Sequence, residues 1–293
     1  MTITTHQETR GMWLGLAGVA IFSLTLPFTR MAVAELHPVF VALGRAVVAA
    51  GLSAALLYMQ KAVRPDRQQL RALLIIAVGV VIGFPLLTSL AMQHVPAMHG
   101  AIVLGILPLG TALFAALRFH ERPSAGFWMM AVLGSALVVV FALIQGAGEF
   151  QWADLALFGA VIAASMGYAE GGRLSQVMGG QRVICWALVI SMPVLLPLTI
   201  WLALHYGLAA SGKAWFGFAY VSVFSMFIGF LFWYKGLAMG GIARVGQVQL
   251  LQPFLSLLGA AVLLGEGLSW MNIGFALAVI GIVAMGRRMN IRR

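Results

Sequence analysis

The chain has 293 residues, 62% of them hydrophobic and only 9% charged, and its formal net charge is +10. Because a soluble domain carries about 25% charged residues, this composition excludes a water-soluble domain and indicates that the lipid bilayer is the protein's solvent. The basic residues are scattered between apolar runs, which excludes the continuous basic face of a nucleic-acid-binding protein.

A transmembrane helix requires about 20 mainly apolar residues, and the sequence contains ten such segments. In chain order they are residues 11–29, 38–59, 71–92, 97–117, 124–145, 152–172, 182–204, 214–236, 242–264 and 269–286. Between them lie short breaks rich in proline, glycine or charge, such as "KAVRPDRQQ" and "QGAGEFQ". We therefore predict an all-α membrane protein with ten transmembrane helices and no separate soluble domain.

The positions of the basic residues predict the orientation of these helices. With the N-terminus in the cytoplasm, fifteen Lys and Arg residues fall on the inner side, whereas only Arg30 and Lys213 fall on the outer side. Arg45 lies within a predicted helix. Since cytoplasmic loops carry an excess of Lys and Arg, both termini are predicted to be cytoplasmic.

Two stretches of the chain repeat one pattern. "LPLGTALFAALRFHERPSAG" (107–126) and "QPFLSLLGAAVLLGEGLSW" (252–270) each contain a proline, an acid and a serine at the same spacings. These residues are Pro108, Glu121 and Ser124 in the first copy and Pro253, Glu266 and Ser269 in the second. "IGFPLL" (82–87) and "IGFLFW" (228–233) match in the same order. Each repeat contains five helices, and because this number is odd, the second repeat starts on the opposite side of the membrane from the first. We therefore predict two inverted halves, residues 1–148 and 149–293.

The paired proline-to-acid stretches, the repeat and the "ALGRAVVAA" segment with Arg45 resemble the drug/metabolite transporter superfamily in its ten-helix EamA form. The resemblance covers essentially the whole chain. It implies a multi-pass protein of the cell inner membrane that commonly exports amino acids or other metabolites. Inverted repeats are also the architecture of secondary transporters, in which a site near the midplane is exposed alternately to each side.

Glu121 and Glu266 allow two interpretations. Each acid is either a gating or coupling carboxylate, or the end of a helix, with the serine three residues later capping the next helix. The second interpretation is favoured, because a proton-coupling acid is expected nearer the midplane.

Arg45 is the first candidate for substrate binding, because it lies about seven residues inside a predicted helix. An intramembrane arginine suggests function. It attracts an anionic group of the substrate, extends outward to the interface, or bonds carbonyl groups of a neighbouring helix. The amides of Gln247, Gln249 and Gln252 are further candidates. They either bind substrate or join helices through hydrogen bonds.

The remaining candidates lie on other predicted helices. They are Phe84, Thr88, His99, Tyr168 and Trp233, with Phe22 and Phe230 as further apolar wall residues. Trp233 and Tyr234 also fit an aromatic belt at the membrane interface. We expect no metal site, because the histidines form no close grouping with carboxylates or thiolates.

Pro108 and Pro253 are candidate hinges, because proline bends membrane helices. The sequence shows no catalytic constellation, so we expect no enzyme and no cofactor. The predicted function is a secondary transporter that exports small amphipathic metabolites, such as hydrophobic or aromatic amino acids, by alternating access. The alternative is a membrane enzyme or channel acting on small lipid-soluble solutes. The expected partners are a small-molecule substrate and the bilayer, and the sequence leaves the oligomeric state open.

Overall fold

The computed structural model describes residues 5–119, 122–144, 152–264, 270–287 and 291–292. In the first half of the chain the helices are α1 (Thr5–Ser23), α2 (Thr25–Val33), α3 (Pro38–Met59), α4 (Arg67–Ile76), η1 (Ala77–Gly83), α5 (Phe84–Ala91), α6 (Ala97–Val103), η2 (Leu104–Ile106), α7 (Leu107–Phe119) and α8 (Ala125–Ile144). In the second half they are α9 (Trp152–Met178), α10 (Gly180–Tyr206), α11 (Gly212–Ala219), η3 (Tyr220–Gly229), α12 (Phe230–Gly240), α13 (Ile242–Gly246), η4 (Gln247–Leu251), α14 (Gln252–Leu264) and α15 (Trp270–Arg287).

One short antiparallel strand pair accompanies the helices. It joins β1 (Arg122–Pro123) to β2 (Ile291–Arg292). Because this pair involves only two residues on each strand, the predicted all-helical class is confirmed.

The predicted apolar segments coincide with helices or with unbroken successions of helices, and residues 38–59 have the same bounds as α3. Six of these runs are long and apolar enough to cross a membrane, and they are Gln7–Val33, Pro38–Met59, Arg67–Ala91, Trp152–Met178, Gly180–Tyr206 and Gly212–Gly240. Shorter apolar helices cover Leu104–Phe119, Ala125–Leu137 and Ile273–Ile282. The count of ten transmembrane helices stays a prediction.

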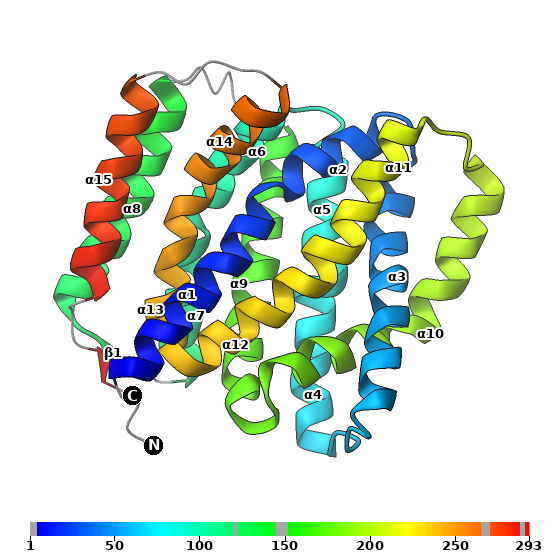
Figure 1. The fold of residues 1–293 in the computed structure, drawn as a ribbon, viewed down its shortest axis with the longest axis horizontal. Coiled ribbons are helices and arrows are strands. Elements are labelled where there is room, and N and C mark those ends of the chain that lie inside the picture. Colours follow the sequence, from blue (N-terminus) through cyan, green and yellow to red (C-terminus); the bar gives the residue numbers. More distant parts are fainter. Residues whose placement is uncertain (1–4, 120–121, 145–151, 265–269, 288–290, 293) are drawn as a thin grey trace.

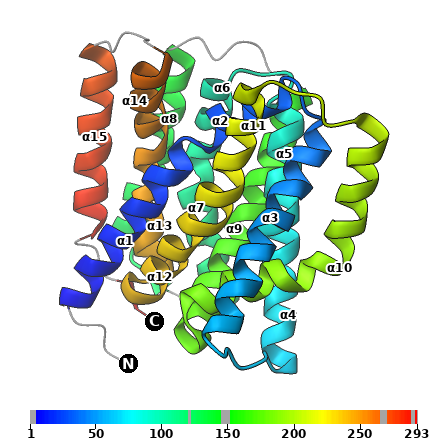
Figure 2. The ribbon, with the colours of Figure 1, turned by 45° about the vertical axis from the view of Figure 1, so that its right-hand side comes forward.

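The helices form a bundle in which successive runs alternate in direction (Figures 1 and 2). The first run, α1 with α2, starts at the end of the bundle where α15 finishes, and α9 starts at the opposite end (Figure 1). The second half of the chain therefore begins in the reverse direction from the first.

The packing of the helices follows the same two-fold relationship. α1 packs on α12, and the corresponding helix of the second half, α9, packs on α4, η1 and α5. Likewise α7 packs on α9 and α14 packs on α1, while α3 pairs with α10 and α8 with α15. Exchanging the halves maps these pairs onto one another, so the main contacts of the bundle join one half to the other.

Helix irregularities occur at matching places in the two halves. The π-helices η1 and η3 interrupt the third helical run of each half, and the 3₁₀ segments η2 and η4 interrupt the fourth. Pro108 and Pro253 are each the second residue of the α-helix that follows the 3₁₀ segment, and a proline lacks the N–H that would bond the carbonyl four residues earlier. The orphaned carbonyls of Leu104 and Gln249 instead accept tighter bonds from the backbone N–H groups of Leu107 and Gln252.

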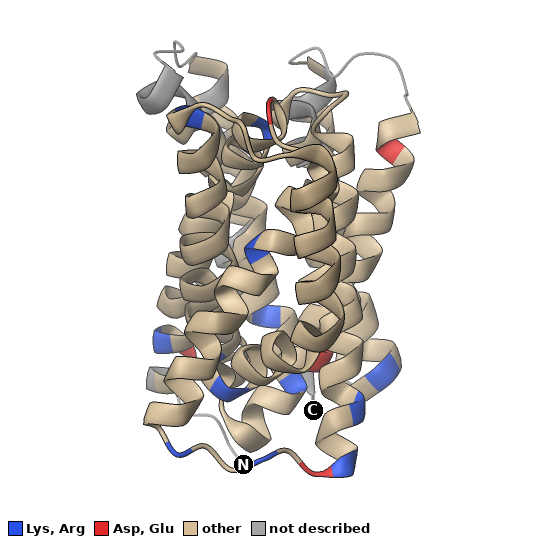
Figure 3. Cartoon of the chain, turned by 90° about the vertical axis from the view of Figure 1, so that its right-hand side faces the viewer, with Lys and Arg blue, Asp and Glu red and all other residues tan. Residues whose placement is uncertain are grey.

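Most Lys and Arg residues gather at the end of the bundle where α1 begins (Figure 3). The arginine-rich connection between α3 and α4 and the arginines near the ends of α7 and α9 contribute to this gathering. The other end carries few basic residues (Figure 3). This asymmetry agrees with the predicted cytoplasmic termini, which stay a prediction.

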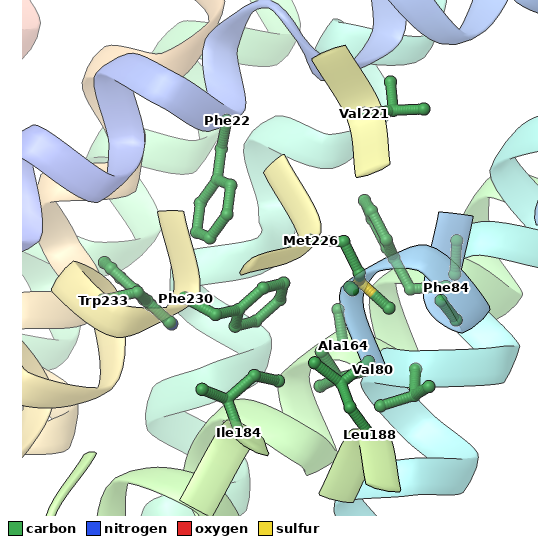
Figure 4. Close-up of a cluster of buried hydrophobic side chains, with 14 of the residues drawn as sticks. Phe22, Val80, Phe84, Ala164, Ile184, Leu188, Val221, Met226, Phe230 and Trp233 are labelled. Atoms are coloured by element: carbon green, nitrogen blue, oxygen red, sulfur yellow. The ribbon is translucent and has the colours of Figure 1, made fainter. Parts of the chain in front are cut away.

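The buried core is rich in aromatic rings where the halves meet. Phe22 from α1 points toward Phe230 and Trp233 from α12 (Figure 4), with ring centroids 4.9 and 6.2 Å away. Glycines allow the two helix backbones to approach here. A Cβ added to Gly236 of α12 would lie 2.8 Å from the backbone nitrogen of Gly15 in α1.

Candidate functional site

A small cavity lies between the two halves, with walls from α1, α2, α3, α5, η2, α7, α9, η3, α12 and α14. Its volume is about 10 Å³, which is room for about one water molecule. Aromatic rings form much of the wall, and they are Phe22, Phe84, Tyr168 and Phe230. Leucines complete the apolar surface, and they are Leu26, Leu104 and Leu107. The structure is therefore closed around a mainly apolar chamber.

Arg45 is the charged residue of this wall, and it is 1% exposed. Its Nη2 lies 4.0 Å from the sulfur of Met226, a weak acceptor. Its Nε and Nη1 have no hydrogen-bond partner among the described residues. The ionisable group that it faces there is the phenol of Tyr168. A guanidinium buried in this way is strongly disfavoured unless an anion joins it.

Further polar groups surround the arginine. The hydroxyls of Thr25 and Ser225 lie 2.9 Å apart and join α2 to η3 across the cavity wall. The Gln252 side chain completes the polar part of the wall. The fully buried amide of Gln249 lies next to the Tyr168 phenol, yet by geometry it forms no hydrogen bond with the described residues. This amide is therefore available as a donor and an acceptor close to the cavity.

Helix breaks shape the cavity. Pro27 leaves the carbonyl of Ser23 without its helical donor, and the hydroxyl of Ser256 donates a hydrogen bond of 2.6 Å to that carbonyl. Leu104 and Leu107 lie at η2, and Gln252 lies at the end of η4. The cavity is therefore built where repeat-related helices change from 3₁₀ to α geometry.

Four of the predicted substrate residues line the cavity, namely Arg45, Phe84, Tyr168 and Gln252. Thr88 lies behind the wall, where its hydroxyl donates to the carbonyl of Phe84 at 2.7 Å.

The other predicted residues whose side chains the structure describes lie outside the cavity wall. Trp233 is fully buried and packs on the ring of Tyr168, with centroids 5.4 Å apart. The interfacial position considered for Trp233 and Tyr234 is wrong, because both are 0% exposed. Gln247 is buried, and its amide has no partner among the described residues. The side chain of His99 lies outside what the structure describes. As substrate-binding residues, all of these stay predictions.

Sequence reasoning missed Thr25 and Ser225 as cavity residues. Both are small hydroxyl residues within apolar helices, where such residues commonly bond to their own backbone. The sequence offered one signal, which was the short distance along the chain from the predicted wall residues. Thr25 lies three residues after Phe22, and Ser225 lies five residues before Phe230.

Ion pairs connect the halves at the end of the bundle where α1 begins. Arg118 Nε of α7 lies 2.7 Å from Glu170 Oε2 of α9. Arg244 of α13 pairs with Glu8 of α1. Each pair joins a residue of the first half to one of the second, so the two together hold this end closed.

Hydrogen bonds and ring stacking close the opposite end. The Glu35 carboxylate accepts bonds from the hydroxyl and backbone N–H of Ser211, at 2.6 and 2.7 Å. These bonds lower the pKa of Glu35 below its ordinary value of 4.5. The ring of His37 stacks on Tyr206, with centroids 3.8 Å apart. Burial is the main cause that lowers the pKa of His37, which favours its neutral form.

The histidines at this end pack on aromatic rings. His94 contacts Trp152 and His205 stacks on Trp201. In the described part of the chain, His, Cys, Asp and Glu residues form no group of three that could hold a metal ion.

The predicted cap by Ser124 is present, since its hydroxyl accepts the N–H of Phe127 at 3.3 Å. Glu121, Glu266 and Ser269 lie outside the described residues. The lone Cys185 is buried.

Comparison with known proteins decides the family. The model of the EamA-like transporter family matches the chain twice, at residues 9–143 and 151–287. The chain belongs to this family. Its two matches correspond to the two oppositely directed halves of the bundle, so the cavity of this EamA protein lies between its two family repeats.

Individual relatives agree with this assignment. The chain is 47% identical to the "Uncharacterized transporter YdeK" of Bacillus subtilis (strain 168) over 283 residues, covering 97% of this chain and 99% of the relative. It is 25% identical to the "Probable terminal-alkyne amino-acid exporter" of Streptantibioticus cattleyicolor, covering 78% and 77% of the two chains. A solved structure described as "Crystal structure of protein" superimposes with a TM-score of 0.77 at 16% identity, over 95% of this chain and 98% of that one. This last likeness supports the fold.

Proposed function

We propose that this EamA family member is a secondary transporter of the cell inner membrane that exports small amphipathic metabolites, such as hydrophobic or aromatic amino acids. Ten helices cross the membrane with both termini in the cytoplasm, and the boundary between the repeats lies at residues 148/149. The substrate binds between the repeats, which open alternately to each side.

The observation that carries this proposal is the buried arginine in an aromatic cavity between the two repeats. Aromatic rings from both halves suit an apolar or aromatic side chain. The guanidinium of Arg45 suits a carboxylate, which it can bind with two parallel hydrogen bonds. The relative named as a probable amino-acid exporter supports substrates of this kind.

The small size of the cavity supports alternating access. A volume of about 10 Å³ is too small for an amino acid, so the halves must separate for the substrate to enter and leave. Pro108 and Pro253 are the proposed hinges, because each follows a 3₁₀ segment whose backbone bonds differ from those of the adjoining α-helix. Phe84, Thr88, His99, Tyr168, Trp233 and the three glutamines (Gln247, Gln249 and Gln252) complete the proposed site once it opens.

The test is transport by purified protein in liposomes. Vesicles are loaded with a panel of labelled amphipathic solutes that includes phenylalanine, leucine and their deaminated analogues, and efflux is compared with that from protein-free vesicles. We expect at least one solute to leave faster with the protein. Arg45→Gln should abolish this efflux, and the matched control Arg64→Gln should retain it, because Arg64 is exposed between α3 and α4. If no solute moves faster than in protein-free vesicles, the proposed function is wrong.

A further inference from the structure

We propose that the site selects organic monoanions, meaning hydrophobic or aromatic carboxylates without an ammonium group, and that the membrane potential drives their export. This inference rests on the proposed transport function and narrows its substrate class. It starts from the charges of the cavity wall, in which eleven residues contribute one formal charge, the cation Arg45.

The described acidic residues are not part of the cavity wall. Glu8 pairs with Arg244, Glu170 pairs with Arg118, and Glu35 accepts bonds from Ser211. Asp66 caps α4, and Asp154 lies in the first turn of α9. The remaining acids, Glu121, Glu149 and Glu266, lie outside the described residues. Among the described residues, the cavity wall therefore offers a partner for a carboxylate but no carboxylate for an ammonium group.

Repulsion by Arg45 acts against a zwitterion. In an α-amino acid whose carboxylate binds the guanidinium, the ammonium group lies about 5 Å from it. At an effective dielectric constant of about 20, two like charges at this distance reduce affinity by roughly 300-fold. An ammonium on an aromatic face gains about 2- to 30-fold. The repulsion is the larger effect, so a carboxylate without an ammonium group binds better than its amino-acid counterpart.

The charge moved in each cycle follows from this assignment. The loaded site is neutral, because the carboxylate offsets Arg45, and the empty site carries the charge of Arg45. One cycle that releases an anion outside and returns empty moves one negative charge outward. An inside-negative potential favours this direction, by about 50-fold in the equilibrium concentration ratio for each 100 mV. Export of this kind needs no proton-coupling acid in the cavity.

The experiment compares solutes that share a phenyl ring and differ in charge. Liposomes containing the full chain are loaded separately with phenylpyruvate, N-acetylphenylalanine, phenylalanine or phenethylamine. A potassium gradient with valinomycin then sets the potential inside negative or inside positive. We expect both monoanions to leave at least tenfold faster than phenylalanine and phenethylamine, with efflux faster when the inside is negative. Protein-free liposomes measure passive leak, which is subtracted.

Two variants separate the role of Arg45 from folding. Arg45→Gln should abolish efflux of the monoanions. Arg45→Lys keeps the charge and should retain the preference for them at a lower rate. Phenylalanine efflux that equals or exceeds monoanion efflux overturns the inference and leaves the proposed transport function standing. Monoanion efflux that does not change with the sign of the potential also overturns it. Absence of efflux for every solute refutes the transport function itself.

Discussion

Replacing Arg45 by methionine should make the protein more stable while it destroys transport. The arginine is 1% exposed, and two of its nitrogens have no hydrogen-bond partner among the described residues. An arginine at the centre of a membrane helix costs about 2.5–3.5 kcal/mol on insertion scales. Methionine has a similar length and no charge, so we expect Arg45→Met to raise the free energy of unfolding by roughly 2 kcal/mol.

Thermal unfolding of the purified protein in detergent measures this change. A gain of 1 kcal/mol raises Tm by about 2–4 °C in proteins of roughly this size, so the expected increase is roughly 4–8 °C. Arg118→Met is the matched control, because Arg118 pairs with Glu170 at 2.7 Å and that carboxylate is 10% exposed. Leaving the carboxylate unpaired should cost about 1–3 kcal/mol. The same substitution should therefore shift Tm in opposite directions at the two positions.

Ligand binding gives a second measurement on the same proteins. A ligand at 100 times its Kd stabilises the folded state by about 2.7 kcal/mol. An aromatic carboxylate at such a concentration should raise the Tm of the wild-type protein and leave that of Arg45→Met unchanged. A lower Tm for Arg45→Met without ligand would refute this reasoning, because it would show that the guanidinium stabilises the fold.

Two further predictions concern helix packing and the end of the bundle that contains Glu35. Gly236→Ala should lower stability by about 1–3 kcal/mol in thermal unfolding, because the added Cβ would meet the backbone of α1. The control Gly51→Ala should not lower stability, because no atom lies within 4 Å of its added Cβ. Equal effects of the two substitutions would contradict the close contact at Gly236. Glu35→Gln should loosen the bonds to Ser211 and speed the reaction of an introduced Thr25→Cys with a membrane-impermeant thiol reagent. Low pH should have the same effect on the wild-type protein. Because the pKa of Glu35 is lowered, its carboxylate stays ionised and accepts these bonds at and above pH 4.5, and it loses this role as the pH falls through the lowered pKa. If neither Glu35→Gln nor low pH changes the labelling rate, Glu35 does not hold this end of the bundle closed.

The helices were predictable because one physical requirement decides them. A run of about 20 apolar residues in lipid must satisfy its backbone hydrogen bonds within the helix, and residues 38–59 show the result, since α3 has the same bounds. Arg45 and Tyr168 were also predictable as residues of the cavity wall. A charged or polar side chain within an apolar run stands out in the sequence, and both residues line the cavity.

Thr25, Ser225 and the interfacial alternative for Trp233 show where prediction from sequence fails. Thr25 and Ser225 meet only because α2 and η3, which are far apart in the chain, pack together. Trp233 is fully buried because α12 packs against α1. Long-range packing decides both outcomes, and the apolar pattern of one helix does not contain it.

The duplicated fold carries a buried arginine that is not duplicated, and in the proposed mechanism this difference makes the two openings unequal. Arg45 lies in α3, whereas α10, its partner across the two-fold relationship, has its arginine near the first turn, at Arg182. In the proposed orientation Arg45 is roughly 10 Å from the outer end of its helix. Opening toward the outside therefore brings water to the guanidinium over a short path. Water weakens the attraction between the guanidinium and a bound anion severalfold by raising the local dielectric constant. Opening toward the cytoplasm leaves the same pair deep in the bundle, where the attraction stays strong. In the proposed cycle the anion therefore binds more tightly from the inside and leaves more readily on the outside, while the membrane potential sets the direction of net transport.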